Sequence, residues 1–128
     1  MNLILDTHTM LWMMFENRRL SASAAGLIND PANSLWVGVS SLWETAIKIS
    51  IGKLTIPGSD IKLVFDSLAS YGIGILAIRP NHLRLLQTLP MIHRDPFDRI
   101  LIAQSMSEGF PLISADRHIR TYEVESRW

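Results

Sequence analysis

Short apolar runs alternate along the chain with longer stretches of helical period. The apolar runs cover residues 3–6, 34–40, 73–78 and 111–114. Their β-branched, nearly continuous apolar character is typical of strands that are buried on both faces. Residues 123–128 fit a final edge strand. The pattern therefore predicts short strands spread over the whole chain.

Helical patterns fill the intervals between these strands. The predicted helices cover residues 7–17, 21–30, 41–50, 60–72, 80–89 and 96–108, and a short helical turn covers 115–122. Gly52 and Gly109 follow two of these helices as C-caps, and Pro80 suits the first turn of another. Strands that alternate with helices form parallel βαβ units. We therefore expect an α/β fold, with helices on both faces of a parallel sheet.

The composition describes one compact domain, residues 1–128, with 48% hydrophobic and 19% charged residues. The formal net charge is zero, so bulk electrostatics do not indicate a nucleic-acid partner. The absence of cysteine excludes disulfides and thiolate chemistry, and it suits the reducing cytoplasm where we expect the protein. The apolar start has no basic leader and is too short to span a membrane, so we expect no membrane partner.

Charged residues concentrate where the helix at 96–108 begins. Within "HRDPFDR", Asp95 suits the N-cap, Pro96 the first helical position and Asp98 the third, where the helix dipole favours a negative charge. Capping thus explains both carboxylates locally. The alternative is that Asp98 is a ligand and Asp95 alone is the cap.

Three further acids also have a local explanation. Asp6 could cap the first helix and Asp116 the turn after residues 111–114. Ser41 and Glu44 fit a capping box, and Glu44 also forms a favourable i,i+4 pair with Lys48.

Capping does not explain why these acids follow strands that should end at one edge. Asp6 and Asp116 directly follow predicted strands, and Glu44 lies a few residues past another. Ligands of open α/β sheets bind at that edge, and Asp98 could join it. Carboxylates gathered there raise one another's pKa values unless a cation neutralises them. Magnesium fits better than zinc, which favours His and Cys ligands. The four acids expected at one edge of the sheet therefore favour a metal site.

Four motifs resemble those of a known family. The segments "LILDTH", "SLWETAIKISIGKL", "HRDPFDRILIAQ" and "LISADRHI" are similar to those of the PIN-domain ribonucleases, in particular the VapC-type toxins of bacterial toxin–antitoxin pairs. The resemblance runs over nearly the whole chain. It implies a PIN-like domain with a parallel sheet of about five strands. It also implies that Mg²⁺ or Mn²⁺ is held by Asp6, Glu44, Asp98 and Asp116, with Asp116 acting through water.

The implied reaction is hydrolysis of RNA phosphodiesters by metal-activated water, leaving 5′-phosphate and 3′-hydroxyl ends. Thr7 and Ser114 resemble polar positions beside the pocket, where they would orient the ligands. Arg94 and Arg99 could steer RNA phosphates to the metal. The alternative is that they pair with Asp95 and Asp98 or are simply solvated.

The resemblance also implies partners. VapC-like toxins usually form homodimers and bind a cognate antitoxin that covers the groove by the active site. The first predicted helix has two apolar faces, of which one can serve the core and the other a partner. The alternative is a helix buried between neighbouring elements.

Other functions fit the residues less well. A phosphatase of the haloacid-dehalogenase type needs an aspartate where His8 stands, and a receiver module needs a lysine later than Lys62, the last in the chain. A catalytically inactive PIN-type scaffold that binds RNA or protein remains the alternative, and a DNA-cutting relative is conceivable. The histidines (His8, His82, His93 and His118) show no metal-ligand spacing, so we expect surface or packing roles for them.

Overall fold

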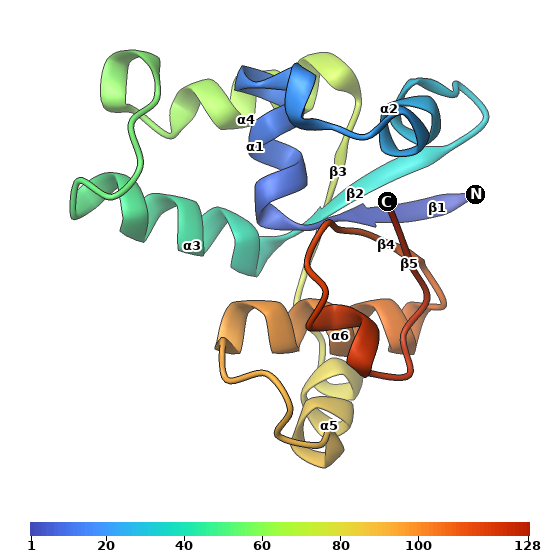
Figure 1. Cartoon of the computed structure of the whole chain (residues 1–128). Helices are drawn as coiled ribbons and strands as arrows, with labels where there is room; N and C mark the ends of the chain where they lie inside the picture. Colours follow the sequence, from blue (N-terminus) through green and yellow to red (C-terminus); the bar gives the residue numbers. More distant parts are fainter.

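The computed structural model describes all residues from Met1 to Trp128 and contains one five-stranded sheet (Figure 1). Its strands are β1 (Asn2–Leu5), β2 (Ser34–Gly38), β3 (Gly74–Leu76), β4 (Leu112–Ile113) and β5 (Ser126–Arg127). They lie in the order β3-β2-β1-β4-β5, and every neighbouring pair is parallel. The predicted α/β class and the parallel sheet are confirmed, with β1 at the centre.

Helices cover both faces of this sheet. They are α1 (Thr7–Phe15), α2 (Ala22–Asn29), α3 (Val39–Ser50), α4 (Lys62–Tyr71), α5 (Pro80–Thr88) and α6 (Pro96–Glu108), with short 3-10 turns at Asn17–Arg19, Pro57–Ser59 and Ile119–Thr121. Figure 1 shows α1, α2 and α4 on one side of the sheet and α5 and α6 on the other. None of these helices has the length and apolar character needed to cross a membrane.

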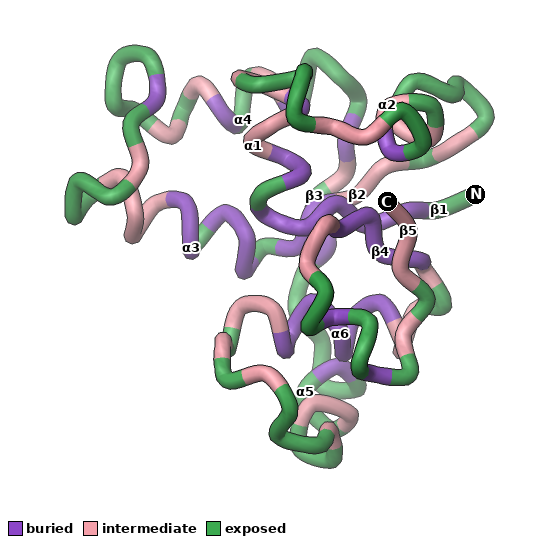
Figure 2. The backbone as a smooth tube through the Cα atoms, viewed as in Figure 1, coloured by how far each residue is buried: buried purple, intermediate pink, exposed green.

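The alternating side chains of β1 divide the core into two layers. Leu3 and Leu5 pack with Met10 and Met13 of α1, whereas Ile4 faces the other way, toward α6 and β4. The buried part of the backbone runs through the middle of the molecule in Figure 2. Burial on both faces explains why the central strands are apolar throughout.

The start of α3 differs from the prediction. The capping box predicted a start at Ser41, but the helix begins at Val39, and Gly38 caps it without a side-chain hydrogen bond. A Cβ atom on Gly38 would lie 2.7 Å from Leu101 Cδ2, so a larger residue where the strand ends would displace side chains of α6. The capping-box prediction is therefore wrong, and Glu44 lies beyond the first turn with its carboxylate free for other partners.

Candidate functional site

Asp6 lies at the end of β1 and combines a capping role with a place in the site. Its Oδ1 accepts a hydrogen bond from the Thr9 amide at 2.8 Å, which caps α1. Its Oδ2 accepts one from the Ser114 hydroxyl at 2.5 Å. The side chain is almost fully buried, because α1 and the end of β4 enclose it. The cap therefore fixes the carboxylate at the sheet edge.

Glu44 is a buried carboxylate in α3 with a polar partner on each oxygen. The Thr7 hydroxyl donates to Oε1 at 2.7 Å, and the Lys48 ammonium donates to Oε2 at 2.7 Å. The hydroxyl of Ser41 lies 3.0 Å from that of Thr7. Because Thr7 directly follows Asp6, these contacts join α3 to the end of β1.

Asp98 lies in the first turn of α6, and Asp95 caps that helix as predicted, accepting from the Phe97 amide at 2.9 Å. Burial and the neighbouring charge of Asp95 raise the pKa of Asp98 to about 7, while His93 acts in the opposite direction. The carboxylates of Asp6 and Glu44 also raise this pKa. Acids from three separate segments therefore act on one another electrostatically, as convergence at one edge requires.

Asp116 lies in the loop after β4, where it both shapes the loop and faces the site. Its Oδ1 accepts from the His118 amide at 2.9 Å, which forms a tight turn. Its own amide donates to the Ser114 hydroxyl at 3.0 Å. Ser114 thus links Asp116 to Asp6, and the structure brings all four predicted acids to the carboxyl edge of the sheet.

His93 also belongs to this group, and the expectation of a surface or packing role is wrong for it. Its Nε2 lies 2.9 Å from Asp98 Oδ2 and 3.4 Å from Asp116 Oδ2. These three side chains form a potential metal-binding group, with ligand atoms within 4.8 Å of one another. The one sequence feature that could have placed His93 near the site is its position two residues before Asp95, the cap of α6. Spacing alone missed it because its partners come from other elements.

The two predicted arginines differ in position. Arg94 is exposed, so it is available to a substrate. Arg99 is buried, and its guanidinium donates to the backbone carbonyl of Pro90 at 2.9 Å. The expectation that Arg99 steers phosphates is therefore wrong, and so is its alternative pairing with Asp95 or Asp98. Arg99 instead holds the loop between α5 and α6.

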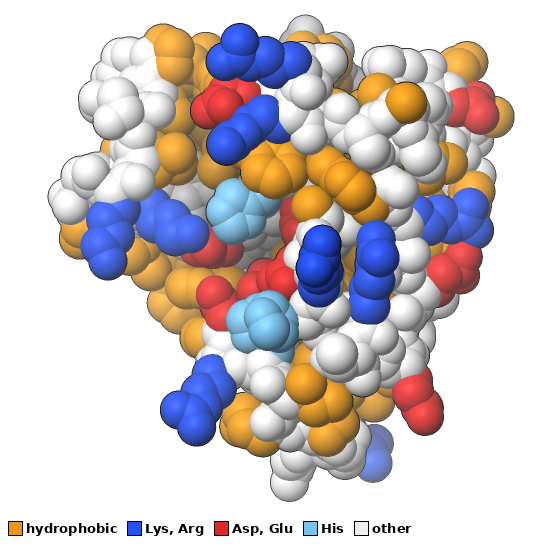
Figure 3. Space-filling model, viewed as in Figure 1, with side chains coloured by type: hydrophobic (Ala, Val, Ile, Leu, Met, Phe, Trp, Pro, Cys, Tyr) orange, Lys and Arg blue, Asp and Glu red, His pale blue; other side chains and the backbone are white.

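Figure 3 shows the acidic side chains in a central hollow, with histidines next to them and lysines and arginines around the rim. A cavity of about 270 Å³ on this face is lined by Asp6, Asp116, His8 and Trp12, together with Ala115. A second hollow of about 200 Å³ runs along α1 and the end of α3. An anionic chain that approaches this face meets positive charge first and the acids behind it.

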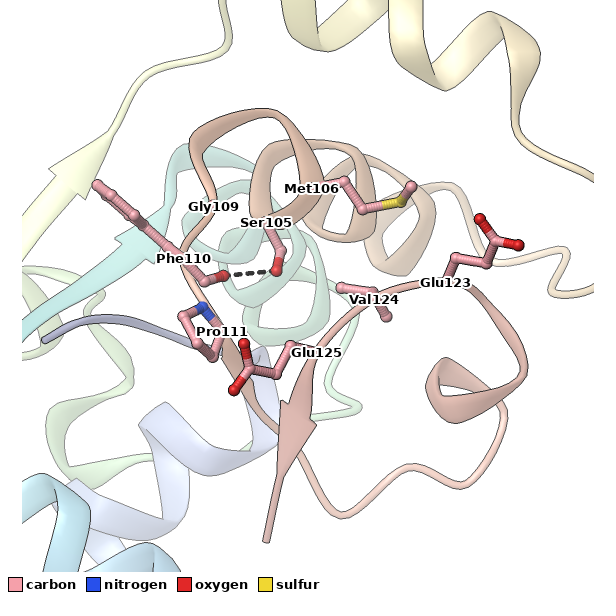
Figure 4. A pocket seen from close by; sticks show the side chains of 8 residues that line it. All are labelled: Ser105, Met106, Gly109, Phe110, Pro111, Glu123, Val124 and Glu125. Atoms are coloured by element: carbon pink, nitrogen blue, oxygen red, sulfur yellow. Dashed lines mark hydrogen bonds between the residues drawn. The ribbon is translucent and has the colours of Figure 1, made fainter.

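Another cavity lies away from the four predicted metal ligands. It measures about 260 Å³ and lies between the end of α6 and the segment before β5 (Figure 4). The Ser105 hydroxyl at its wall donates to the Phe110 carbonyl at 2.5 Å, so this polar group is already satisfied. The catalytic candidates all lie elsewhere.

The fold and the acidic edge define the class of protein. The family model of the PIN domain matches residues 3–125, so the chain belongs to the PIN domain family.

Individual relatives extend this result. Ribonuclease VapC22 of Mycobacterium tuberculosis is 29% identical over 122 residues, which span 93% of this chain and 90% of that protein. The crystal structure of VapBC2 from Rickettsia felis, bound to a DNA fragment from their promoter, has a similar fold, with a TM-score of 0.77 at 12% identity over 100% of this chain and 99% of that chain. The crystal structure of DNA-bound VapBC from Salmonella typhimurium has a TM-score of 0.70 at 12% identity, over 99% of this chain and 97% of that chain.

Proposed function

We propose that this chain is a divalent-metal-dependent endoribonuclease that acts as the toxin of a toxin–antitoxin pair. The observation that carries the proposal is the gathering of Asp6, Glu44, Asp98 and Asp116 at one edge of the sheet in a PIN fold. The relatedness to a ribonuclease VapC supports RNA as the substrate.

The proposed metal ligands are Asp6, Glu44, Asp98 and Asp116, and the ion is Mg²⁺ or Mn²⁺. The residues present fit such an ion, because carboxylate oxygens are its preferred ligands. Burial, followed by the charges of neighbouring carboxylates, raises the pKa of Asp98, and a bound cation would offset both effects. When bound, the ion supplies an activated water and stabilises charge on the phosphoryl oxygens. We expect Asp116, the least buried of the four side chains, to act through water.

The other residues of the site orient these ligands. Thr7 holds Glu44, and Ser114 holds Asp6 and the amide of Asp116. Such outer partners fix the direction of a ligand's lone pairs. Lys48 neutralises one oxygen of Glu44, which lowers the cost of burying it. The exposed side chains of Arg94 and Arg117 are placed to contact the RNA backbone.

The proposed partners are a cognate antitoxin and a second copy of the chain. The hollow along α1 supports the first, because Leu11, Trp12 and Phe15 line it with Lys48 and Lys53, next to the acidic edge. Exposed Val39 and Trp43 on α3 support the second. Of the two apolar faces of α1, the one with Met10 and Met13 serves the core. The cytoplasm, where RNA and an antitoxin would be met, remains the predicted location.

The experiment is a cleavage assay on total RNA with Mg²⁺ or Mn²⁺, repeated with EDTA. Asp98→Asn should reduce cleavage by at least about 100-fold, because an amide cannot replace the anionic ligand. Asp66→Asn, which changes an exposed carboxylate of α4, is the matched control and should cleave normally. Ligation-based sequencing of the products should find 5′-phosphate ends.

The circular dichroism spectrum of Asp98→Asn should match that of the unmodified chain. A folded, unmodified chain that cleaves no RNA with either ion would instead favour the inactive scaffold. Undiminished cleavage by Asp98→Asn would remove Asp98 from the ligand set.

A further inference from the structure

His93 presents a nitrogen to the acidic site that the proposed ligand set does not use. Its Nε2 lies 2.9 Å from Asp98 Oδ2 and 3.4 Å from Asp116 Oδ2. Yet this buried atom has no hydrogen bond of good geometry with either carboxylate. The nitrogen therefore faces the space between two acids without being satisfied by one of them.

The other ring nitrogen indicates which one carries the proton. Nδ1 accepts a hydrogen bond from the Asp95 amide at 3.3 Å. A nitrogen that accepts holds no proton, so the neutral ring carries its proton on Nε2, toward the acids. Coordination of a metal through Nε2 would require the opposite tautomer. The geometry thus favours a donor over a metal ligand.

The position of His93 is fixed by a segment far along the chain. The buried hydroxyl of Tyr122 accepts from the His93 amide at 2.7 Å and from the Ile92 amide at 3.2 Å. Arg99 Nη1 lies 3.2 Å from the same hydroxyl and holds the Pro90 carbonyl. A loop held at so many backbone atoms keeps the ring in place when its acidic neighbours acquire other partners.

We propose that His93 is a substrate-contacting residue whose Nε2–H donates to a non-bridging phosphate oxygen of the RNA. The inference rests on the proposed function. Asp98 and Asp116 would turn from His93 toward a cation if they held one, and Nε2–H would then be available to an anionic phosphate oxygen of the RNA. With Nδ1 accepting from the Asp95 amide, Nε2 is the nitrogen that carries the required proton. A backbone contact of this kind increases affinity for RNA without selecting a sequence.

Two substitutions distinguish the loss of the Nε2–H donor from the loss of the imidazole ring. In His93→Gln the amide N–H reaches about as far as Nε2, whereas in His93→Asn it stops near the position of Nδ1. Affinity is measured by fluorescence anisotropy with a labelled, mixed-sequence single-stranded RNA, with Ca²⁺ as the cation and the RNA verified as intact on a gel. His93→Asn should bind about 10–100-fold more weakly, as expected for a lost hydrogen bond to a charged group. His93→Gln should stay within about threefold of the unmodified chain.

Long-range ¹H–¹⁵N NMR spectra of the unmodified chain report the tautomer of His93 directly. The Nε2–H tautomer should persist when Mg²⁺ is added. A change to the Nδ1–H tautomer would identify His93 as a metal ligand and overturn the inference. Unchanged binding by His93→Asn, or an equal loss in both variants, would overturn it as well.

These outcomes are separate from a failure of the proposed function. If the unmodified chain cleaves RNA and His93→Asn binds RNA normally, only the role of His93 is lost. If the unmodified chain neither binds nor cleaves RNA, the nuclease proposal fails first, and the role of His93 fails with it.

Discussion

At the scale of single residues, Asp98 connects the site to the stability of the fold. In the folded protein its pKa is about 7, against a usual value of 3.8. The folded state therefore keeps this proton through a range of pH in which the unfolded chain has released it. By linkage, the free energy of unfolding falls as the pH rises from about 4 to about 7.

Asp98→Asn should remove this dependence, because the amide never ionises. Urea denaturation in EDTA should find the variant more stable than the unmodified chain at pH 8, by on the order of 2 kcal/mol, with the difference vanishing near pH 4. Glu123→Gln, which changes an exposed carboxylate, is the control and should show no such trend. An Asp98→Asn variant that is less stable than the unmodified chain at pH 8 would contradict the crowding of acids at this edge.

Tyr122 tests the support of the loop before α6. Tyr122→Phe removes the hydroxyl that accepts from the amides of Ile92 and His93 and contacts Arg99. We expect a loss of about 1–3 kcal/mol in the free energy of unfolding, because buried donors lose their acceptor. Urea denaturation measures it, and Tyr71→Phe, at an exposed side chain of α4, serves as the comparison. Equal stability of the two variants would show that the hydroxyl is dispensable.

At the scale of elements, sequence patterns found each helix and strand, and the errors are local. The capping-box signal at Ser41 was misleading because the backbone turns into α3 earlier, where Gly38 passes against α6. That packing is a tertiary contact between β2 and a helix far along the chain, and no local pattern encodes it. In contrast, the cap at Asp95 was predictable, since its two hydrogen bonds join it only to residues of the next turn.

Two glycine substitutions distinguish a glycine that packs against another element from one that affects only its own helix. Gly38→Ala should destabilise the fold by about 1–3 kcal/mol, because its Cβ would lie 2.7 Å from Leu101 Cδ2 and 2.8 Å from Gln104 Oε1. Gly26→Ala, with no atom near its Cβ in α2, should stabilise by up to about 1 kcal/mol through helix propensity. Thermal and urea denaturation measure the change in stability of each variant. A stable Gly38→Ala variant would contradict the close packing of β2 on α6.

At the scale of the whole molecule, a formal net charge of zero hides an uneven distribution of charge. Acids occupy the hollow of one face, and basic side chains surround it (Figure 3). Composition alone could not predict this arrangement, because it depends on which strand ends meet. The convergence of acids was predictable from parallel topology, whereas the inward turn of His93 and the burial of Arg99 depend on the path of one loop.

The basic rim predicts how RNA binding depends on salt. Arg117→Gln removes an exposed charge next to Asp116, and it should reduce the slope of log K against log salt by about 0.7 for a single-stranded RNA. Anisotropy titrations at several salt concentrations measure the slope. Arg84→Gln should leave it unchanged, since Arg84 lies in α5 beside Asn81 and Leu85, at a separate hollow. Equal slopes for Arg117→Gln and the unmodified chain would exclude this arginine from the RNA path.

The hydrogen bond between Ser114 and Asp6 spans 108 positions of the chain. During translation, the first strand and the helix that carries Glu44 leave the ribosome long before β4, which completes the pocket. On the proposed function, a chain that ends before β4 would contain three of the four proposed ligands but could not cleave RNA, because Ser114 and Asp116 are missing. Nuclease activity would then appear only near the end of synthesis, when an antitoxin can already bind the completed chain.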